Sequence, residues 1–173
     1  LALKLIASVH QSDETVVYLD TCHTFDPDYA IRCGVKPDQL VTALPQSPAE
    51  GVEILYDLVS QRAARLIVVS STVPLLADHT LANALPRLRR RLTKSGSALV
   101  FLTPLAETYS PLSPLPQDAE TRLQVTRQAW LGHGADVEGY QIQVTILKQK
   151  PRPPGGSVRL AISFAETVQG DAT

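Results

Sequence analysis

Apolar residues lie in short blocks whose spacing alternates between that of strands and that of helices. Continuous apolar runs rich in β-branched residues predict buried strands at 15–19, 40–43, 65–69 and 98–102. Helical spacing, with proline or small polar residues near some of the starts, predicts helices at 1–9, 26–33, 47–61 and within 78–94. The alternation of strands with helices is typical of a parallel sheet covered by helices, the α/β class.

The pattern changes near residue 103. Proline and serine are frequent at 103–118, which predicts a loop without a packed core of its own. Three strand-like segments then follow one another at 122–130, 141–147 and 158–164. Consecutive strands predict an antiparallel extension of the parallel sheet, with a basic hairpin rich in proline and glycine at about 148–157. We expect residues 1–173 to form a single domain.

Composition narrows the classes of function. A formal net charge of -1 disfavours a surface that is basic throughout, so any nucleic-acid contact must be local. Two cysteines, Cys22 and Cys33, are too few for a disulfide framework, and we expect a reducing compartment, the cytoplasm. The histidines are scattered, so we expect no metal cluster. The apolar start is too short for a membrane span, and the absence of methionine suggests a piece of a longer protein.

The helix predicted within 78–94 carries two stripes. Its apolar stripe consists of Leu81, Leu85, Leu88 and Leu92. Its basic stripe consists of Arg87, Arg90, Arg91 and Lys94. A basic stripe suits the phosphates of nucleic acid, and it is also typical of a solvated helix face. Both interpretations stay open at this point.

Four strings in the sequence, taken with their order and separation, carry a resemblance to a known family. They are LDTCHTFDPDYA, LIVVSSTVPL, LVFLTP and VTILKQK. Together they resemble the ATPase core of RecA and of related archaeal and eukaryotic recombinases, from about residue 1 to residue 164. The resemblance implies a RecA-like three-layer fold with helices on both faces of the sheet. It also implies ATP as a ligand, assembly with itself or a RecA-like protein, and a role in DNA recombination or repair.

The resemblance also identifies departures from the family. The glycine-rich loop that binds the phosphates of ATP would precede Leu1, and it is not in this sequence. Cys22 stands where the family has the glutamate that orients the attacking water, and Ser70 where it has an aspartate of the Mg²⁺ shell. Thr103 and Pro104 stand at the polar pair that senses the γ-phosphate. These positions imply weak or absent hydrolysis and little support for Mg²⁺.

Other matched positions keep the residue types of the family. Asp26 and Tyr29 match the acid and the aromatic residue that hold adenine; the alternative roles are a helix N-cap and a core aromatic. Lys148 and Lys150 match two lysines that reach the nucleotide of a neighbouring protomer. Their alternative role is protection of a solvated edge strand.

The family holds single-stranded DNA with two loops, and neither is preserved here. The first is cut to a few residues around 76–78, and the second lacks a glycine-rich or basic run. The resemblance therefore implies weak binding of single-stranded DNA, with the basic stripe as the remaining candidate site.

Three functions follow as hypotheses. We favour a RecA-family paralogue in DNA recombination or repair that is a weak or inactive ATPase and works through assembly linked to nucleotide or to a partner. The alternative is a non-ATPase adaptor that resembles SOS-response cell-division inhibitors or the RecA-like accessory subunits of translesion synthesis. The third is a working DNA-dependent ATPase whose phosphate-binding loop precedes Leu1.

Overall fold

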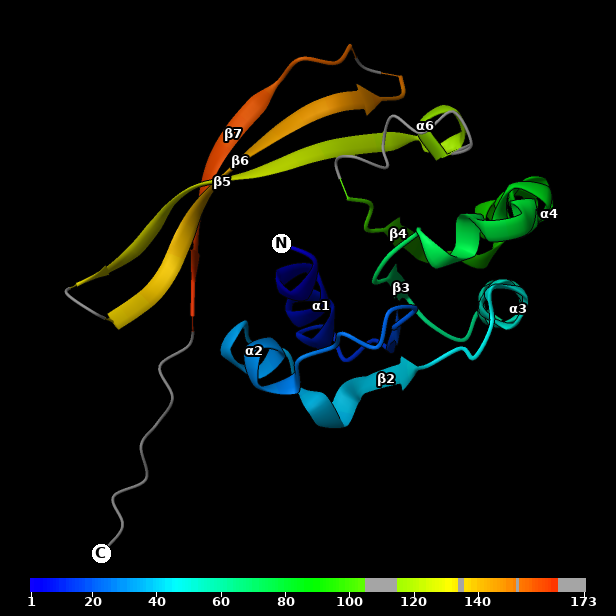
Figure 1. The fold of residues 1–173 in the computed structure, drawn as a ribbon, viewed down its shortest axis with the longest axis horizontal. Helices are drawn as coiled ribbons and strands as arrows, with labels where there is room; N and C mark the ends of the chain where they lie inside the picture. The colour runs from blue at the N-terminus through cyan, green and yellow to red at the C-terminus, as the bar shows by residue number, and fades with distance from the viewer. Residues whose placement is uncertain (105–114, 134–135, 152, 165–173) are drawn as a thin grey trace, which may run out of the picture.

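The computed structural model describes residues 1–104, 115–133, 136–151 and 153–164. Residues up to Phe101 form alternating strands and helices (Figure 1). The helices are α1 (Ala2–His10), α2 (Pro27–Arg32), α3 (Pro48–Ser60) and α4 (Thr80–Ser95), with short 3-10 helices η1 (Pro37–Gln39) and η2 (Pro74–His79). The strands are β1 (Val16–Leu19), β2 (Leu40–Ala43), β3 (Leu66–Val69) and β4 (Ala98–Phe101). The predicted order of these elements is confirmed.

The four strands form one parallel sheet in the order β2-β1-β3-β4. Successive side chains of a strand point to opposite faces, so β1 serves two cores. Val16 and Tyr18 pack with α1 and α2, whereas Val17 and Leu19 pack with α3 and α4. Helices therefore cover both faces of the sheet (Figure 1), and the predicted α/β class is confirmed.

Local signals explain where the helices begin and end. The Ser47 hydroxyl accepts a hydrogen bond from the N–H of Glu50 at 3.2 Å, and the Glu50 carboxylate accepts one from the N–H of Gln46 at 2.6 Å. Gly96 ends α4 with a φ of 76°, a conformation that glycine adopts at little cost. None of the helices in the described ranges is long and apolar enough to cross a membrane.

The C-terminal strands pair with each other in the antiparallel sense, as predicted. They are β5 (Thr121–His133), β6 (Asp136–Gln149) and β7 (Ser157–Ser163). Their hydrogen bonds form a sheet of their own in the order β5-β6-β7, separate from the parallel sheet. Ile142, Val144 and Ile162 form its small buried cluster. Figure 1 shows this sheet lying across the α1 side of the molecule.

The segment predicted as a loop at 103–118 is corrected in its last part. Residues 105–114 lie outside the described residues. Leu115–Asp118 forms the short helix α6, and Leu115 is only 8% exposed because it packs into the core shared with α3 and α4. The prolines of this segment did not prevent the helix, since Pro116 stands in its first turn, where proline is tolerated.

Candidate functional site

Polar side chains gather where β1, β3 and β4 end, at the carboxyl edge of the parallel sheet. The register pairs Leu19 with Val69 and Val69 with Phe101, so the residues that follow these strands are neighbours. They are Asp20 and Thr21 after β1, Ser70, Ser71 and Thr72 after β3, and Thr103 after β4. We call these six residues the strand-end network. In open α/β sheets, ligands usually bind at this edge.

Asp20 is the buried carboxylate of this network, with 1% of its surface exposed. The Ser70 hydroxyl donates a hydrogen bond to its Oδ1 at 3.0 Å, and the N–H of Phe25 donates to its Oδ2 at 2.8 Å. Burial by itself raises the pKa of Asp20, but the N–H groups of Phe25 and Thr24 and the Ser70 hydroxyl lower it, and the net shift is downward. Asp20 therefore stays ionised as an internal acceptor.

The hydroxyl groups of the network connect neighbouring strands. The Ser70 oxygen accepts a hydrogen bond from the N–H of Thr21 at 3.0 Å. The Thr21 hydroxyl donates to the carbonyl oxygen of Ser71 at 2.7 Å. At the next pair of strands, the hydroxyls of Thr72 and Thr103 lie 3.1 Å apart. The strand ends are thus joined to each other by their own polar groups.

This arrangement does not fit the magnesium centre that the family resemblance implies. Ser70, which the resemblance matches to the metal-shell aspartate, is a neutral hydroxyl already bonded to Asp20, whereas proteins hold Mg²⁺ mainly through carboxylates. Cys22, which the resemblance matches to the water-orienting glutamate, is an exposed free thiol. Within the described ranges, no group of three or more His, Cys, Asp or Glu side chains could hold a metal ion.

Asp26 and Tyr29, which the resemblance matches to the adenine-binding pair, both make contacts within the chain. Asp26 is the N-cap of α2, and its carboxylate accepts a hydrogen bond from the N–H of Tyr29 at 2.9 Å. The Tyr29 hydroxyl donates to that of Tyr140 on β6 at 3.0 Å, and its ring lies edge-on to Phe164. Burial and then the bond with Tyr140 raise the pKa of Tyr29. The N-cap role of Asp26 is confirmed, and Tyr29 links α2 to the second sheet.

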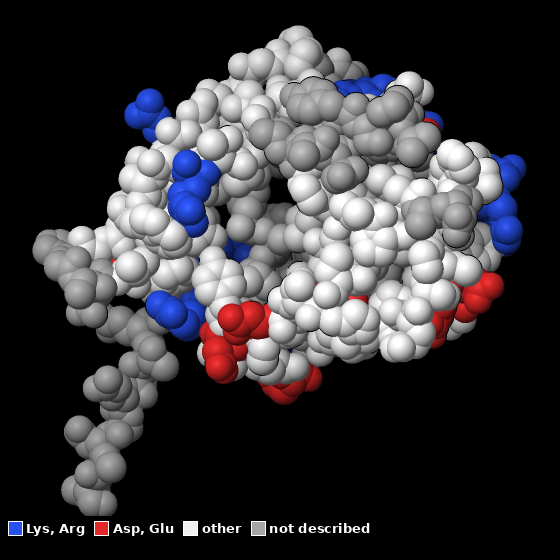
Figure 2. All heavy atoms as spheres, viewed as in Figure 1, with Lys and Arg blue, Asp and Glu red and all other residues white. Residues whose placement is uncertain are grey.

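A cleft of about 590 Å³ lies between α2 and strands β5 and β6. Figure 2 shows the surface hollowed between the antiparallel sheet and the rest of the molecule. Among the residues that line the cleft are Tyr29, Arg32, Arg127, Trp130, Tyr140 and Phe164. It is the second candidate site, and it combines aromatic rings with guanidinium groups.

Lys148 lies at the end of β6, and Lys150 lies just beyond it. β6 is the central strand of its sheet and ends at Gln149, so Lys148 is not on an edge strand and Lys150 lies beyond the strand. The edge-strand interpretation is thereby corrected. The Lys148 ammonium donates to the carbonyl oxygens of Pro116 and Gln117 at 3.2 and 2.6 Å, where the partial negative charge of a helix end favours a cation.

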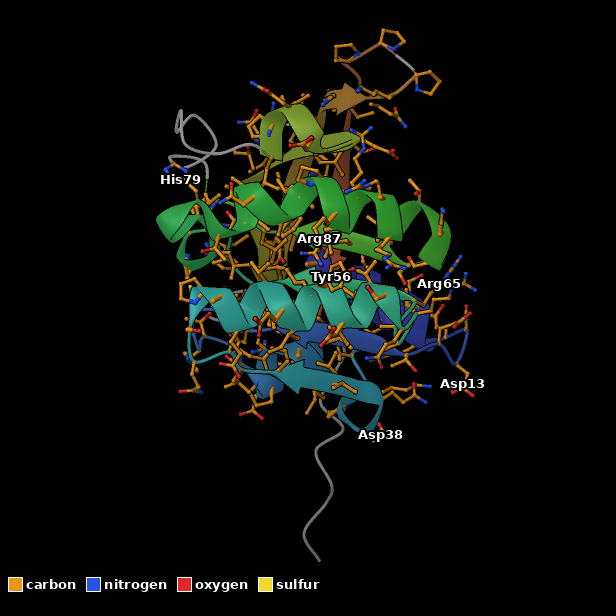
Figure 3. All side chains as sticks on the ribbon, turned by 90° about the vertical axis from the view of Figure 1, so that its right-hand side faces the viewer. Asp13, Asp38, Tyr56, Arg65, His79 and Arg87 are labelled. Atoms are coloured by element: carbon orange, nitrogen blue, oxygen red, sulfur yellow. The ribbon has the colours of Figure 1, made fainter. Side chains whose placement is uncertain are left out.

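The basic stripe lies on the exposed face of α4, while Leu81, Leu85 and Leu88 are buried. The Arg87 and Arg91 guanidinium groups lie 4.6 and 6.0 Å from the centroid of the Tyr56 ring on α3. Figure 3 shows Tyr56 and Arg87 directed toward each other between these helices. Hydrogen bonds from Arg87 and Arg91 lower the pKa of Tyr56 to about 8.

Arg90 and Lys94 complete this stripe, and both are exposed. The Arg90 Nε donates to the carbonyl oxygen of Pro86 at 3.3 Å, so this side chain folds back along its own helix. The structure thus brings Arg87 and Arg91 together around one ring and leaves the other half of the stripe on the helix surface.

Four aromatic residues that shape these sites are absent from the sequence prediction: Tyr56, Trp130, Tyr140 and Phe164. Trp130 and Phe164 are the last residues of two segments that were predicted as strands. This position was the signal in the sequence that could have indicated them. The contact between Trp130 and Tyr140 depends on the register between β5 and β6, which shifts at three places. A register with such bulges cannot be read from alternation alone.

Comparison with known proteins gives a family match. The model of the RecA N-terminal domain matches residues 1–93. The chain is 26% identical over 194 residues to Protein RecA of Aquifex aeolicus, covering 97% of the chain and 56% of that protein. It is 27% identical over 194 residues to Protein RecA of Enterococcus hirae, with the same coverage. The chain spans about half the length of the curated relatives that it matches.

Proposed function

The chain belongs to the family of the RecA N-terminal domain, and from this membership we propose that it acts in DNA recombination or repair and hydrolyses ATP weakly or not at all. The observation that carries the second part is the hydrogen bond from Ser70 to Asp20. It joins two strand ends at the edge where a catalytic centre would bind metal and phosphate. We propose the cytoplasm as its compartment, since Cys22 and Cys33 are free thiols.

Loss of hydrolysis follows from the chemistry of two positions. A glutamate at position 22 would accept a hydrogen bond from water and orient it, which a thiol does poorly. An aspartate at position 70 would supply a negative charge to the ligand shell of a metal ion, whereas the Ser70 hydroxyl is neutral. The Ser70 oxygen also accepts a hydrogen bond from the N–H of Thr21. Repulsion between a carboxylate at position 70 and buried Asp20 is also avoided in this chain.

ATP remains the proposed ligand at Asp26 and Tyr29, with weak binding. Adenine that stacks on Tyr29 must compete with the Tyr140 hydroxyl and the Phe164 ring for the same side chain. Lys148 is bonded to two carbonyl oxygens of its own chain. The proposed contact with nucleotide of a neighbouring protomer therefore depends chiefly on Lys150, which is exposed.

The proposed partners are a second copy of the chain, a RecA-like protein, and single-stranded DNA at the basic stripe. Arg87 and Arg91 are held against Tyr56, so they lose little further freedom when they bind a phosphate. The adaptor without ATPase activity is the second candidate function. The closed strand-end network favours it, because an adaptor needs the fold and the surface but no open catalytic edge.

Steady-state ATPase measurements with and without single-stranded DNA test the proposal. We expect no turnover above background. The double variant Cys22→Glu/Ser70→Asp restores the residue types of the family, and a matched control, Cys22→Gln/Ser70→Asn, has similar size without the charges. Turnover of the unaltered chain in the ordinary enzyme range of about 1 per second or more would overturn the proposal.

The proposed assembly and DNA contacts need separate measurements. Sedimentation of the unaltered chain and of Lys148→Ala/Lys150→Ala, each with and without ATP, tests the interface, and unchanged assembly of the variant would reject it. Anisotropy across a salt series tests the stripe. The variant Arg87→Gln/Arg91→Gln should flatten the salt slope by roughly one to two charges, because the slope reports the phosphates neutralised.

A further inference from the structure

A tyrosine and two arginines meet on the outer surface where α3 packs against α4. The Arg87 and Arg91 guanidinium groups lie 4.6 and 6.0 Å from the centroid of the Tyr56 ring. The two arginines are one helical turn apart, so they share one face of α4. The helices share a buried core that includes Leu55 and Leu88, each adjacent in sequence to a member of this group. The packing of the helices therefore holds the three side chains, which we call the tyrosine cluster, at one point of the surface.

Tyr56 differs from the other tyrosines in the described ranges. Tyr18 is buried, and the hydroxyls of Tyr29 and Tyr140 are bonded to each other at 3.0 Å. Tyr56 is half-buried, and the arginines of its cluster are exposed. In Figure 3 this side of α3 and α4 faces the viewer. Tyr56 is thus the described tyrosine that reaches the surface with two charged partners.

The hydrogen-bonding groups of the tyrosine cluster are out of balance. Two guanidinium groups, each with several N–H donors, surround one neutral phenolic oxygen. In the described part of the chain, neither arginine forms an ion pair with a carboxylate. Ser60 lies one turn further along α3, and its buried hydroxyl has no hydrogen-bond partner among the described residues. An anionic group attached to the Tyr56 oxygen would supply the missing acceptors.

The ionisation of Tyr56 agrees with this view of the cluster. Hydrogen bonds from Arg87, and then from Arg91, lower the pKa of Tyr56 to about 8. These donors therefore stabilise negative charge at the phenolic oxygen. Charge carried by a group bonded to that oxygen would be stabilised for the same reason.

We propose that Tyr56 is a phosphorylation site and that Arg87 and Arg91 hold the phosphate that it carries. A tyrosine kinase supplies the γ-phosphoryl group of ATP. A bond forms between its phosphorus and the Tyr56 oxygen, and the bond to the β–γ bridging oxygen breaks. ADP leaves with the electron pair, and the phenolic proton passes to a base of the kinase. Phosphotyrosine carries a charge of about −1.5 to −2 and three acceptor oxygens, which suit two guanidinium groups.

This modification would also change the basic stripe. The phosphate offsets the charges of Arg87 and Arg91, which leaves Arg90 and Lys94 as the uncompensated half of the stripe. We therefore expect phosphorylation to weaken the binding of anionic partners by α4. This regulatory consequence rests on the proposed function of the stripe, whereas the modification and its contacts with arginine do not.

The first test asks whether the folded chain accepts the modification. We select a tyrosine kinase domain that phosphorylates a synthetic peptide of residues 50–62 with ATP and Mg²⁺, and we give it the folded full chain and Tyr56→Phe. Mass spectrometry of the digested products should find phosphate at Tyr56 in the unaltered chain and none on that segment of the variant. A folded chain that stays unmodified at Tyr56, although the peptide is modified, would overturn the proposal.

The second test asks whether the arginines hold the phosphate. In ³¹P NMR of the phosphorylated chain, the second pKa of the phosphate should lie below its ordinary value of about 6, because nearby cations favour the dianion. Arg87→Gln/Arg91→Gln should return this pKa toward the ordinary value. Arg90→Gln is the matched control, because the Arg90 side chain bonds to Pro86 on its own helix. The same phosphate pKa in the unaltered chain and the double variant would reject the contacts, as would an equal rise in the control.

The third test measures the regulatory consequence by anisotropy with a poly(dT) oligonucleotide. Phosphorylation should weaken binding about as much as Arg87→Gln/Arg91→Gln does, since both remove the net positive charge of the pair. Unchanged binding after phosphorylation, with weaker binding by the double variant, would show that the regulatory consequence is wrong. If the unmodified chain does not bind the oligonucleotide, that consequence fails together with the proposed stripe. The first two tests contain no nucleic acid, so their results still decide the phosphorylation site itself.

Discussion

The two sheets of this chain differ in what their strands do with their side chains. In the parallel sheet, every residue of β1 and β3 is buried, at 9% exposure or less. In the antiparallel sheet, Leu123, Val125, Val158 and Leu160 are all at least 37% exposed. The parallel sheet has helices on both faces. The second sheet has a small buried cluster of three residues, with Leu1 packed against it.

The polar groups of the two regions also differ in the partners that they contact. At the carboxyl edge of the parallel sheet, Asp20 and Ser70 bond to each other and to the backbone around them. In the cleft beside the antiparallel sheet, Arg32 and Arg127 lie on aromatic rings at an open surface. The polar groups at the strand ends thus bond to one another, whereas the two arginines of the cleft lie on aromatic rings.

The largest effect we expect concerns the buried core. Ile67→Ala, at a position with 0% exposure, should lower the free energy of unfolding by about 3 kcal/mol, because it removes buried carbon and leaves a cavity. Val158→Ala, at 52% exposure, should cost less than about 1 kcal/mol. Urea unfolding of both variants measures the difference. Equal losses would contradict the contrast in burial between the sheets.

The next effect concerns the strand-end network. Asp20→Asn should cost about 2 kcal/mol, because its buried donors would lose a charged acceptor. The folded-state pKa of Asp20 is lowered, so its stabilisation is present above the ordinary value of 3.8 and is lost as the pH falls through the folded-state value. Asp20→Asn should remove that acid-dependent part. A double-mutant cycle with Ser70→Ala that shows no coupling would mean that the bond between them contributes nothing.

A smaller, pH-dependent effect is expected at His10, which is 1% exposed at the end of α1. Its Nδ1 accepts the N–H of Lys36 at 3.3 Å, and burial, followed by the charge of Lys36, lowers its pKa. The unfolded chain takes up a proton more readily than the folded chain does, so stability should fall as the pH drops below 6.5. Denaturation of the unaltered chain and of His10→Gln at several pH values checks this. The same slope in both would assign the pH dependence to another group.

The smallest effect is a local titration at Tyr56. Absorbance should show one tyrosine that ionises near pH 8, and Arg87→Gln/Arg91→Gln should move it toward 10, since the variant lacks the donors that favour the phenolate. Arg90→Gln is the matched control, because the Arg90 side chain bonds to Pro86 on its own helix. A shift of equal size in the control would mean that general charge, and not the contact with Arg87, sets the pKa.

The sequence by itself determined most of the parallel unit. The strands, the N-caps at Asp26 and Ser47, and the buried stripe of α4 depend on residues close together in the chain, so their local chemistry predicts them. The thiol of Cys22 and the hydroxyl of Ser70, on which the proposal of weak hydrolysis depends, were likewise visible, because a residue type is a property of the sequence. Their hydrogen-bond partners were not, since Ser70 and Asp20 are 50 residues apart.

Only the tertiary structure determined which side chains of the second sheet contact one another. Its register shifts at three places along β5 and β6, and these bulges determine that Trp130 meets Tyr140. The bonds of Lys148 to Pro116 and Gln117 join residues 32 and 31 positions apart, and the burial of Leu115 places α6 on the core of α3 and α4. Local spacing carries no information on such contacts, because their energy arises only when the distant segments pack together.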